Sequence, residues 1–320
     1  MKVLITGGAG FIGSHLCETM LSQGHQVIAI DDLSTGSHTN IAHLESNRDF
    51  QMVVDTVLDT QLINQLIREC DQVLHLASAV GVQLIIDQPT KTIQTIVEGT
   101  RVVLDAAKRY RRPVLITSTS EVYGKGSKIP FSEDDDIVLG PTSTRRWLYA
   151  SAKMLDEFLG LAHWYETRLP VTIVRLFNTV GPRQIGQYGM VLPRFVQKAL
   201  KGDPLTVYGD GKQARCFCHV SDAVTALIKL SQCKDGYGKV INVGSEEEIS
   251  ILELAQKVIA MTDSQSEIEF LSYEKAYTQG FDDMQRRVPD LARIKELVGY
   301  RPDYDLSGVI QSTIAYWQNQ

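Results

Sequence analysis

The stretch KVLITGGAGFIG, residues 2–13, decides the fold of this 320-residue chain. Its first five residues are mostly β-branched or apolar, which predicts a buried strand. Glycines follow at positions 7, 8, 10 and 13, and the apolar pattern of residues 11–23 predicts a helix. A strand, a glycine turn and a helix in this order form a unit that binds phosphates, because glycine lets a pyrophosphate approach the backbone and the helix N-terminus.

The same alternation continues along the first half of the chain. Strands are predicted at residues 26–30, 50–54, 72–77, 114–119 and 171–176, and helices at residues 60–69, 90–110 and 147–167. Most of these strands are apolar at nearly every position, as in parallel sheets covered on both faces. Residues 1–177 are therefore predicted to form a doubly wound parallel α/β sheet, the Rossmann domain of a dinucleotide-binding protein.

After residue 178 the pattern loosens into shorter elements. Helices are predicted at residues 192–201, 251–261 and 306–317, and strands at residues 205–208 and 240–243. We expect residues 178–320 to form a smaller α/β lobe that binds the substrate, with some of its strands returning to the large domain.

Composition restricts the class of partner. A net charge of −6 argues against nucleic acid or an acidic membrane, and no apolar run approaches the roughly 20 residues of a membrane helix. Five cysteines form an odd, uneven set, and an apolar strand follows Met1 directly, so we expect a cytoplasmic protein without a signal peptide. The run CFCH at residues 216–219 lacks a second ligand pair, so no metal is expected.

An acid at the end of the second strand indicates the cofactor. Asp31 stands about 20 residues after the glycines, where a carboxylate binds a ribose diol. It would repel a 2′-phosphate, and residues 32–37 contain no arginine or lysine, so NAD is expected rather than NADP. The residues expected to hold NAD are Gly7, Gly10, Phe11, Ile12, Gly13, Asp31, Asp32, Ala77, Tyr149 and Lys153.

Two residues of the helix predicted at 147–167 indicate the chemistry. Tyr149 and Lys153 are four positions apart and share one helical face. A lysine ammonium lowers the pKa of a neighbouring phenol, so the phenolate can remove a hydroxyl proton while hydride leaves the same carbon.

Motifs spread along nearly the whole chain resemble the extended short-chain dehydrogenase/reductase superfamily. They are the glycine loop, Asp31, HLA at 75–77, STSEVYG at 118–124, Tyr149 with Lys153, RLFNTVGPR at 175–183, YGDG at 208–211, and the motif of Arg215, Phe217, Val220 and Asp222. Relatives of this kind remodel nucleotide-sugars through a 4-keto intermediate and usually dimerise through the helices expected at 90–110 and 147–167. In one departure, Ile96 precedes Gly99-Thr100 where the family usually has asparagine.

The resemblance also implies functional residues. Thr119 would join Tyr149 and Lys153 in the oxidation. Asn178, Arg215 and Arg287 would hold the nucleotide diphosphate, and arginine suits that role because its planar fork binds phosphate oxygens in pairs. Arg146, three positions before Tyr149, resembles UDP-glucuronate decarboxylases and suits a substrate carboxylate. The residues expected to contact the substrate are Ser120, Arg146, Asn178, Arg183, Arg194, Tyr208, Arg215 and Arg287.

Glu121 helps to distinguish among the reactions that such enzymes catalyse. A glutamate two positions after the catalytic threonine resembles UDP-glucuronate decarboxylases and sugar 4,6-dehydratases, whereas simple 4-epimerases usually carry a small residue there. We expect Glu121 to act as a catalytic acid–base group, although a structural role at a helix start is the alternative. Decarboxylation of a UDP-glucuronate-type sugar is the first hypothesis, followed by 4-epimerisation of a nucleotide-sugar and then 4,6-dehydration. A non-catalytic NAD or sugar sensor is the hypothesis from another class.

Overall fold

The computed structural model describes residues 1–78, 87–186, 190–272, 284 and 286–320. Seven parallel strands form its main sheet: β1 (Lys2–Thr6), β2 (Gln26–Asp31), β3 (Phe50–Val54), β4 (Gln72–His75), β5 (Val114–Thr119), β6 (Val171–Leu176) and β11 (Lys239–Val243). Their order is β11-β6-β5-β4-β1-β2-β3. The order reverses between β1 and β4, which is the point at which open α/β sheets bind ligands.

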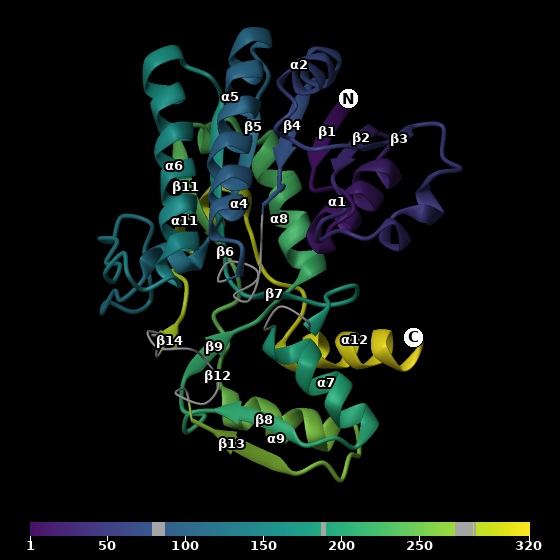
Figure 1. Cartoon of the computed structure of the whole chain (residues 1–320), viewed down its shortest axis with the longest axis vertical. Coiled ribbons are helices and arrows are strands. Elements are labelled where there is room, and N and C mark those ends of the chain that lie inside the picture. The colour runs from purple at the N-terminus through teal and green to yellow at the C-terminus, as the bar shows by residue number, and fades with distance from the viewer. Residues whose placement is uncertain (79–86, 187–189, 273–283, 285) are drawn as a thin grey trace.

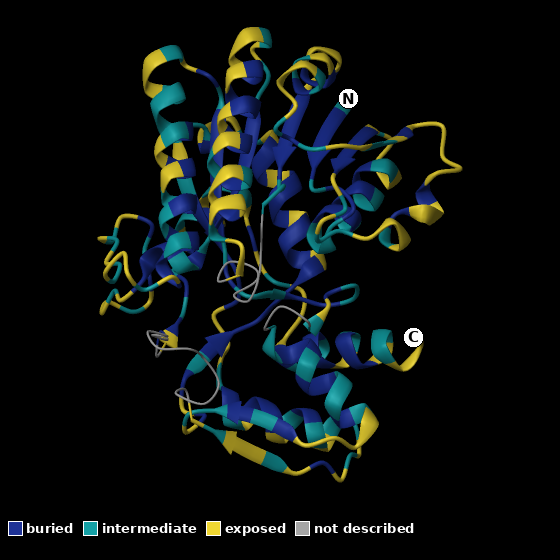
Figure 2. Ribbon diagram, in the orientation of Figure 1, coloured by how far each residue is buried: buried dark blue, intermediate teal, exposed yellow. Residues whose placement is uncertain are grey.

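Helices cover both faces of this sheet (Figure 1). One face carries α2 (Thr60–Glu69), α5 (Gly99–Tyr110) and α6 (Trp147–Thr167), and the other carries α1 (Phe11–Ser22), α8 (Val220–Gln232) and α11 (Ala292–Val298). Figure 2 shows the strands buried between the two layers, with the exposed residues on the outer faces of the helices. The predicted doubly wound α/β fold is confirmed.

The helix predicted at residues 90–110 is interrupted. The structure has α4 (Pro89–Ile93), a π-helical turn at Gln94–Glu98, and then α5. A single wide turn does not disturb the apolar pattern of a helix enough to be seen in the sequence. Its consequence is local: the turn packs against α6 and places Ile96 in one apolar cluster with Tyr149.

The strand β4 and the helix α8 also differ from the prediction. The strand expected at 72–77 ends at His75, because the Ala77 N–H turns to the Thr6 hydroxyl at 3.1 Å and the Leu76 N–H is shared between that hydroxyl and the Thr6 carbonyl at 3.1 Å each. The helix α8 was not predicted. It is buried along much of its length, so its residues show little of the polar face by which a surface helix is recognised.

The second lobe packs around a separate apolar core. It contains α7 (Val191–Lys201), β8 (Leu205–Tyr208), α9 (Ile251–Met261), β13 (Ile268–Leu271) and α12 (Leu306–Gln318). A small sheet of β12 (Glu248–Ser250), β9 (Ala214–Cys216) and β14 (Arg286–Arg287) lies between this lobe and the large domain (Figure 1). The strand β11 and the helices α8 and α11 belong to the large domain although they follow residue 178 in the chain.

No helix in the described ranges has the length and apolar character needed to cross a bilayer.

Candidate active site

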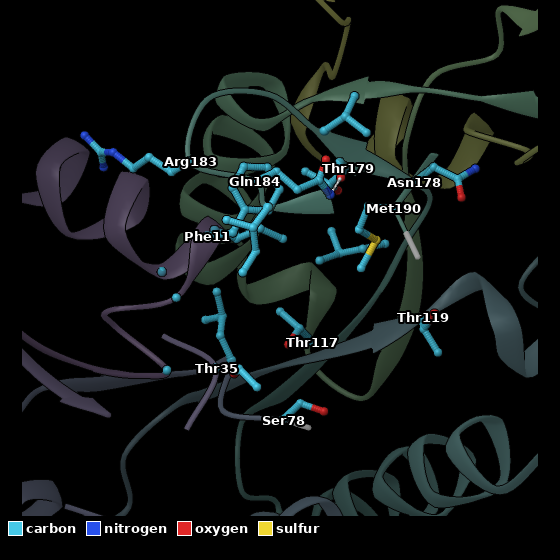
Figure 3. A pocket seen from close by; sticks show the side chains of 18 of the residues that line it. Phe11, Thr35, Ser78, Thr117, Thr119, Asn178, Thr179, Arg183, Gln184 and Met190 are labelled. Atoms are coloured by element: carbon cyan, nitrogen blue, oxygen red, sulfur yellow. Dashed lines mark hydrogen bonds between the residues drawn. The ribbon is translucent and has the colours of Figure 1, made fainter. Parts of the chain in front are cut away.

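One cavity of about 750 Å³ extends from the carboxyl ends of the central strands into the second lobe. It is lined by every residue that the sequence analysis assigned to the cofactor, the chemistry or the substrate. The close view in Figure 3 shows contributions from α1, from the end of β5 and from the segment that follows β6. Sheet topology therefore brings together residues that are up to 280 positions apart (Gly7 to Arg287).

The glycine loop leaves room for a pyrophosphate. Gly7 has a positive φ of 71°, and a Cβ on Gly13 would lie 2.0 Å from the Gly7 carbonyl oxygen, so both positions require glycine. Gly10 precedes α1, and no side chain caps this helix. The N–H groups of its first turn are thus available to an anion.

Asp31 closes the same end of the cavity. Its two carboxylate oxygens accept hydrogen bonds from the N–H groups of Ala9 (3.0 Å) and Leu33 (2.9 Å), which leaves a further lone pair on each oxygen for a diol. Burial raises the pKa of Asp31. Asn40 donates to the Ala9 carbonyl at 2.9 Å and was not found from the sequence, because it lies in a short turn without a motif. Together these residues fit the adenosine half of NAD.

Tyr149 lies near the carboxyl end of β5 and is 9% exposed. Burial raises the pKa of its phenol, and the nearby carboxylates of Glu121 and Asp156 raise it further, while the Ser78 and Thr119 hydroxyls oppose the rise. The phenol therefore stays protonated until a positive charge or a bound ligand favours its ionised form. Ser78 was also absent from the sequence prediction.

Glu121 lies close to Arg287, which is far from it in the sequence. It lies in the 3-10 turn Ser120–Tyr123, which follows β5, and its N–H donates to Thr119 Oγ1 at 3.2 Å. Arg287 Nη1 on β14 lies 3.6 Å from Glu121 Oε1, and both side chains are largely buried. The Ser120 hydroxyl is buried in the cavity wall and has no hydrogen-bond partner among the described residues, so it can donate to a ligand.

The remaining substrate candidates line the second-lobe side. Arg194 donates to the Tyr208 hydroxyl at 2.8 Å and its guanidinium lies 4.8 Å from that ring's centre. Arg215 is paired in register with Arg287 across β9 and β14, so two guanidinium groups start from neighbouring positions. Asn178 donates one amide N–H to the Cys216 carbonyl at 2.8 Å. Two arginines and a fixed tyrosine suit a diphosphate.

Two candidates face other parts of the cavity wall. Arg183 extends toward α1, where it donates to Ser14 Oγ (3.1 Å) and to Glu18 (2.5 Å), whereas Thr119 lies across the cavity (Figure 3). In this arrangement Arg183 joins the second lobe to the cofactor helix rather than reaching the Tyr149 end. Arg146 directly precedes α6, is largely buried, and lies 5.9 Å from the Trp147 ring centre.

Gln184 and Gln213 also line the cavity, and the sequence analysis did not single out either one. Their amides donate to backbone carbonyls of Thr179 (2.9 Å) and Tyr208 (3.0 Å). Residues 187–189, in the loop after Gln184, lie outside the described residues. The described part of the chain holds no group of three His, Cys, Asp or Glu side chains suited to a metal.

The fold and the cavity define the class of protein: an extended short-chain dehydrogenase/reductase. Thr119, Tyr149 and Lys153 all line the cavity. The family described as GDP-mannose 4,6 dehydratase matches residues 4–313, and the chain belongs to this family of nucleotide-sugar enzymes.

Known relatives carry several related activities. The chain is 43% identical over 318 residues to a UDP-N-acetyl-alpha-D-glucosaminuronate decarboxylase of Bacillus cytotoxicus, covering 99% of this chain and 98% of the relative. It is 36% identical to UDP-glucuronic acid decarboxylase 1 of Danio rerio, covering 100% of this chain and 73% of that protein. A solved UDP-glucuronic acid 4-epimerase of Bacillus cereus, in complex with UDP-glucuronic acid and NAD, has a TM-score of 0.89 at 29% identity, covering 100% of this chain and 99% of the other.

Proposed function

We propose that this chain binds NAD and decarboxylates a UDP-linked hexuronate through a 4-keto intermediate. The observation that carries the proposal is the pairing of Glu121 with Arg287 at 3.6 Å, in the same cavity as Tyr149. A base for oxidation, an acid–base group and a cation for a carboxylate are the groups that this reaction requires.

Oxidation begins at Tyr149. Its phenolate accepts the proton of the C4 hydroxyl, and the adjoining Thr119 hydroxyl orients the same oxygen by a hydrogen bond. The glycine loop and Asp31 would hold NAD, which would supply the acceptor for the C4 hydride and, as NADH, the donor that reduces C4 again after CO2 has left. The Lys153 ammonium favours the ionised phenolate by its charge.

Decarboxylation follows from the position of the new ketone. A ketone at C4 lies β to the carboxylate on C5, so the electrons of the breaking C–C bond flow into the carbonyl oxygen. Tyr149 and Thr119 can stabilise that oxygen as negative charge develops. Arg287 binds the carboxylate before it leaves, and Glu121, whose side chain is 19% exposed, passes to C5 a proton taken from solvent water.

The nucleotide occupies the second-lobe side of the cavity. Arg194, Arg215 and Tyr208 would bind the diphosphate there, and Asn178 would contact it through its remaining amide N–H. The curated relatives support a UDP-linked sugar acid, because UDP-glucuronate and its N-acetyl counterpart appear in their names.

The test is a substrate panel followed by mass spectrometry. UDP-glucuronate and UDP-N-acetylglucosaminuronate are each incubated with the protein and NAD, alongside UDP-glucose and GDP-mannose. We expect loss of CO2 from one or both sugar acids and no conversion of the neutral sugars. Conversion of the neutral sugars with loss of water, or no conversion of any of the four, would contradict the proposal.

A second candidate is 4-epimerisation of a UDP-uronate. The similarity of the fold to the Bacillus cereus 4-epimerase extends over the full chain and favours it. Epimerisation leaves the mass unchanged, so proton NMR of the same mixtures identifies it by the changed coupling at C4. That result would leave Glu121 and Arg287 as binding groups only.

We also propose that the protein is a homodimer. Leu155, Phe158 and Tyr165 lie along one outer stripe of α6 and are 44%, 60% and 64% exposed. Apolar side chains at helical spacing on an outer face favour a helix-to-helix interface.

A further inference from the structure

A buried carboxylate lies directly behind the catalytic lysine. Asp156 is three residues after Lys153 on α6 and is fully buried, and its Oδ2 accepts a hydrogen bond from Lys153 Nζ at 3.1 Å. Lys153 lines the cavity but Asp156 does not. The lysine therefore has the substrate site on one side and a fixed negative charge on the other.

A hydrogen-bond chain leads to this carboxylate from the strand beneath the glycine loop. Thr6 Oγ1 accepts the N–H groups of Leu76 and Ala77, which uses both of its lone pairs. The Leu76 N–H is shared with the Thr6 carbonyl, and the arrangement favours donation of the hydroxyl proton to His75 Nδ1, 2.8 Å away. His75 consequently carries its proton on Nε2, which donates to Thr100 Oγ1 at 3.1 Å.

This chain is directed toward Asp156. His75 stays neutral, because burial and the Lys153 charge lower its pKa to about 3. The Thr100 hydroxyl receives the histidine N–H, so its own proton can point to the carboxylate. Burial raises the pKa of Asp156, while the Lys153 ammonium and the Thr100 hydroxyl oppose that rise and the Glu157 carboxylate adds to it. Asp156 Oδ1 makes no close hydrogen bond to any described residue and remains an open acceptor.

An apolar cluster also contacts Tyr149. The π-helical turn places Ile96, fully buried, in a cluster with Tyr149 and Ala152. Because the side chain of Ile96 is apolar, it forms no hydrogen bond with Tyr149 or Lys153. Polar support for Lys153 comes from Asp156.

We propose that Asp156 is a positioning residue: its buried carboxylate, supported through Thr100 and His75 by the strand beneath the glycine loop, holds the Lys153 ammonium in place behind Tyr149. The inference rests on the proposed role of Tyr149 as the base. It assigns to this protein a fourth polar residue, outside the cavity wall, that sets how strongly Lys153 acts on the phenol.

The charges around Tyr149 give the direction of the effect. Lys153 and Asp156 approach from α6, Glu121 from the turn after β5, and Arg287 reaches Glu121 from β14. Asp156 raises the pKa of Tyr149, after the larger effects of burial and Glu121. Neutralising Asp156 removes one negative charge, and this change favours the phenolate.

The first measurement is the pH profile of kcat/KM for the full-length protein with NAD and its converted UDP-uronate. In Asp156→Asn, we expect the acid limb to move about one pH unit lower, with kcat reduced because Lys153 is no longer fixed. Asp156→Glu keeps the charge, so the acid limb of its kcat/KM profile should lie at the same pH as in the wild type. Asp49→Asn, which neutralises an exposed aspartate before β3, serves as the matched control and should change neither quantity.

The second measurement needs no substrate. An amine-acylating reagent is applied to the free protein, and the labelling of Lys153 relative to the other lysines is read by peptide mass spectrometry. Asp156→Asn should raise Lys153 labelling severalfold, and Asp156→Glu should not. This readout separates the two proposals, because the labelling contrast persists even if no UDP-uronate is converted.

Two results would overturn the inference. One is a lower kcat in Asp156→Asn with an unmoved acid limb and wild-type labelling, which would assign Asp156 a purely structural role. The other is equal behaviour of the asparagine and glutamate variants. Asp156→Ser is made in parallel. It also removes the charge, and it allows the same comparison if Asp156→Asn folds poorly.

Discussion

Replacing Glu121 with glutamine tests the step after oxidation. Glutamine keeps the size and hydrogen-bonding shape of the side chain but can neither hold nor release a proton as a carboxylic acid does. Arg287 remains in place, because its guanidinium, now 3.6 Å from the carboxylate, can still donate to the amide oxygen of the glutamine. Binding of the sugar acid should therefore persist.

The expected magnitude follows from exposure and charge. Loss of a positioned acid–base group costs about 10²–10⁴-fold in rate, or about 3–5.5 kcal/mol of barrier. The Glu121 side chain is 19% exposed, so water can partly replace it, and we expect the lower end of this range. The oxidation itself should not slow, because Glu121 raises the pKa of Tyr149 and its neutralisation makes the phenol easier to ionise.

The assay follows NADH absorbance and product formation together on the converted substrate. In Glu121→Gln, NADH should accumulate while product is slowed; in Tyr149→Phe, neither should appear. Glu267→Gln, an exposed change in the second lobe, is the control for the substitution itself. Wild-type turnover of Glu121→Gln would refute the reasoning and make the glutamate a structural residue.

Three further predictions concern the cofactor, the assembly and the stability. NAD should bind at least about tenfold tighter than NADP, because the extra phosphate would face Asp31, and equal dissociation constants in a titration would contradict this. The protein should be dimeric by light scattering and Phe158→Glu, on the exposed stripe of α6, should be monomeric; a monomeric wild type would disprove the interface. Arg175→Met should lower the free energy of unfolding by about 3–5 kcal/mol in urea, because it leaves the buried Glu157 carboxylate without its two-pronged partner. The double variant Arg175→Met/Glu157→Met should recover most of this loss, and an unchanged midpoint in the single variant would show that the pair contributes nothing.

Local patterns in the sequence determined the parallel sheet, most of its strand bounds and the helical face that Tyr149 and Lys153 share. The strands Lys2–Thr6, Phe50–Val54 and Val114–Thr119 and the helix Trp147–Thr167 have the predicted bounds. Each depends on neighbours within one element: continuous apolar runs for buried parallel strands, and the four-residue spacing that puts Tyr149 and Lys153 on one face. The glycine loop was recognised for the same reason, since backbone crowding within the loop itself demands glycine.

Tertiary structure decided which distant residues meet. The sequence did not indicate that Arg287 would lie against Glu121 or that Arg183 would turn to α1. It also did not indicate that the Lys153–Asp156 pair would lie beside a hydrogen-bond chain from Thr6 through His75 to Thr100. The order of strands in the sheet brings these groups together from separate parts of the chain. Periodicity describes the face on which a side chain lies, but only the packing of whole elements determines what that face contacts, and this is the physical reason the site could be located from the sequence while its charge arrangement could not.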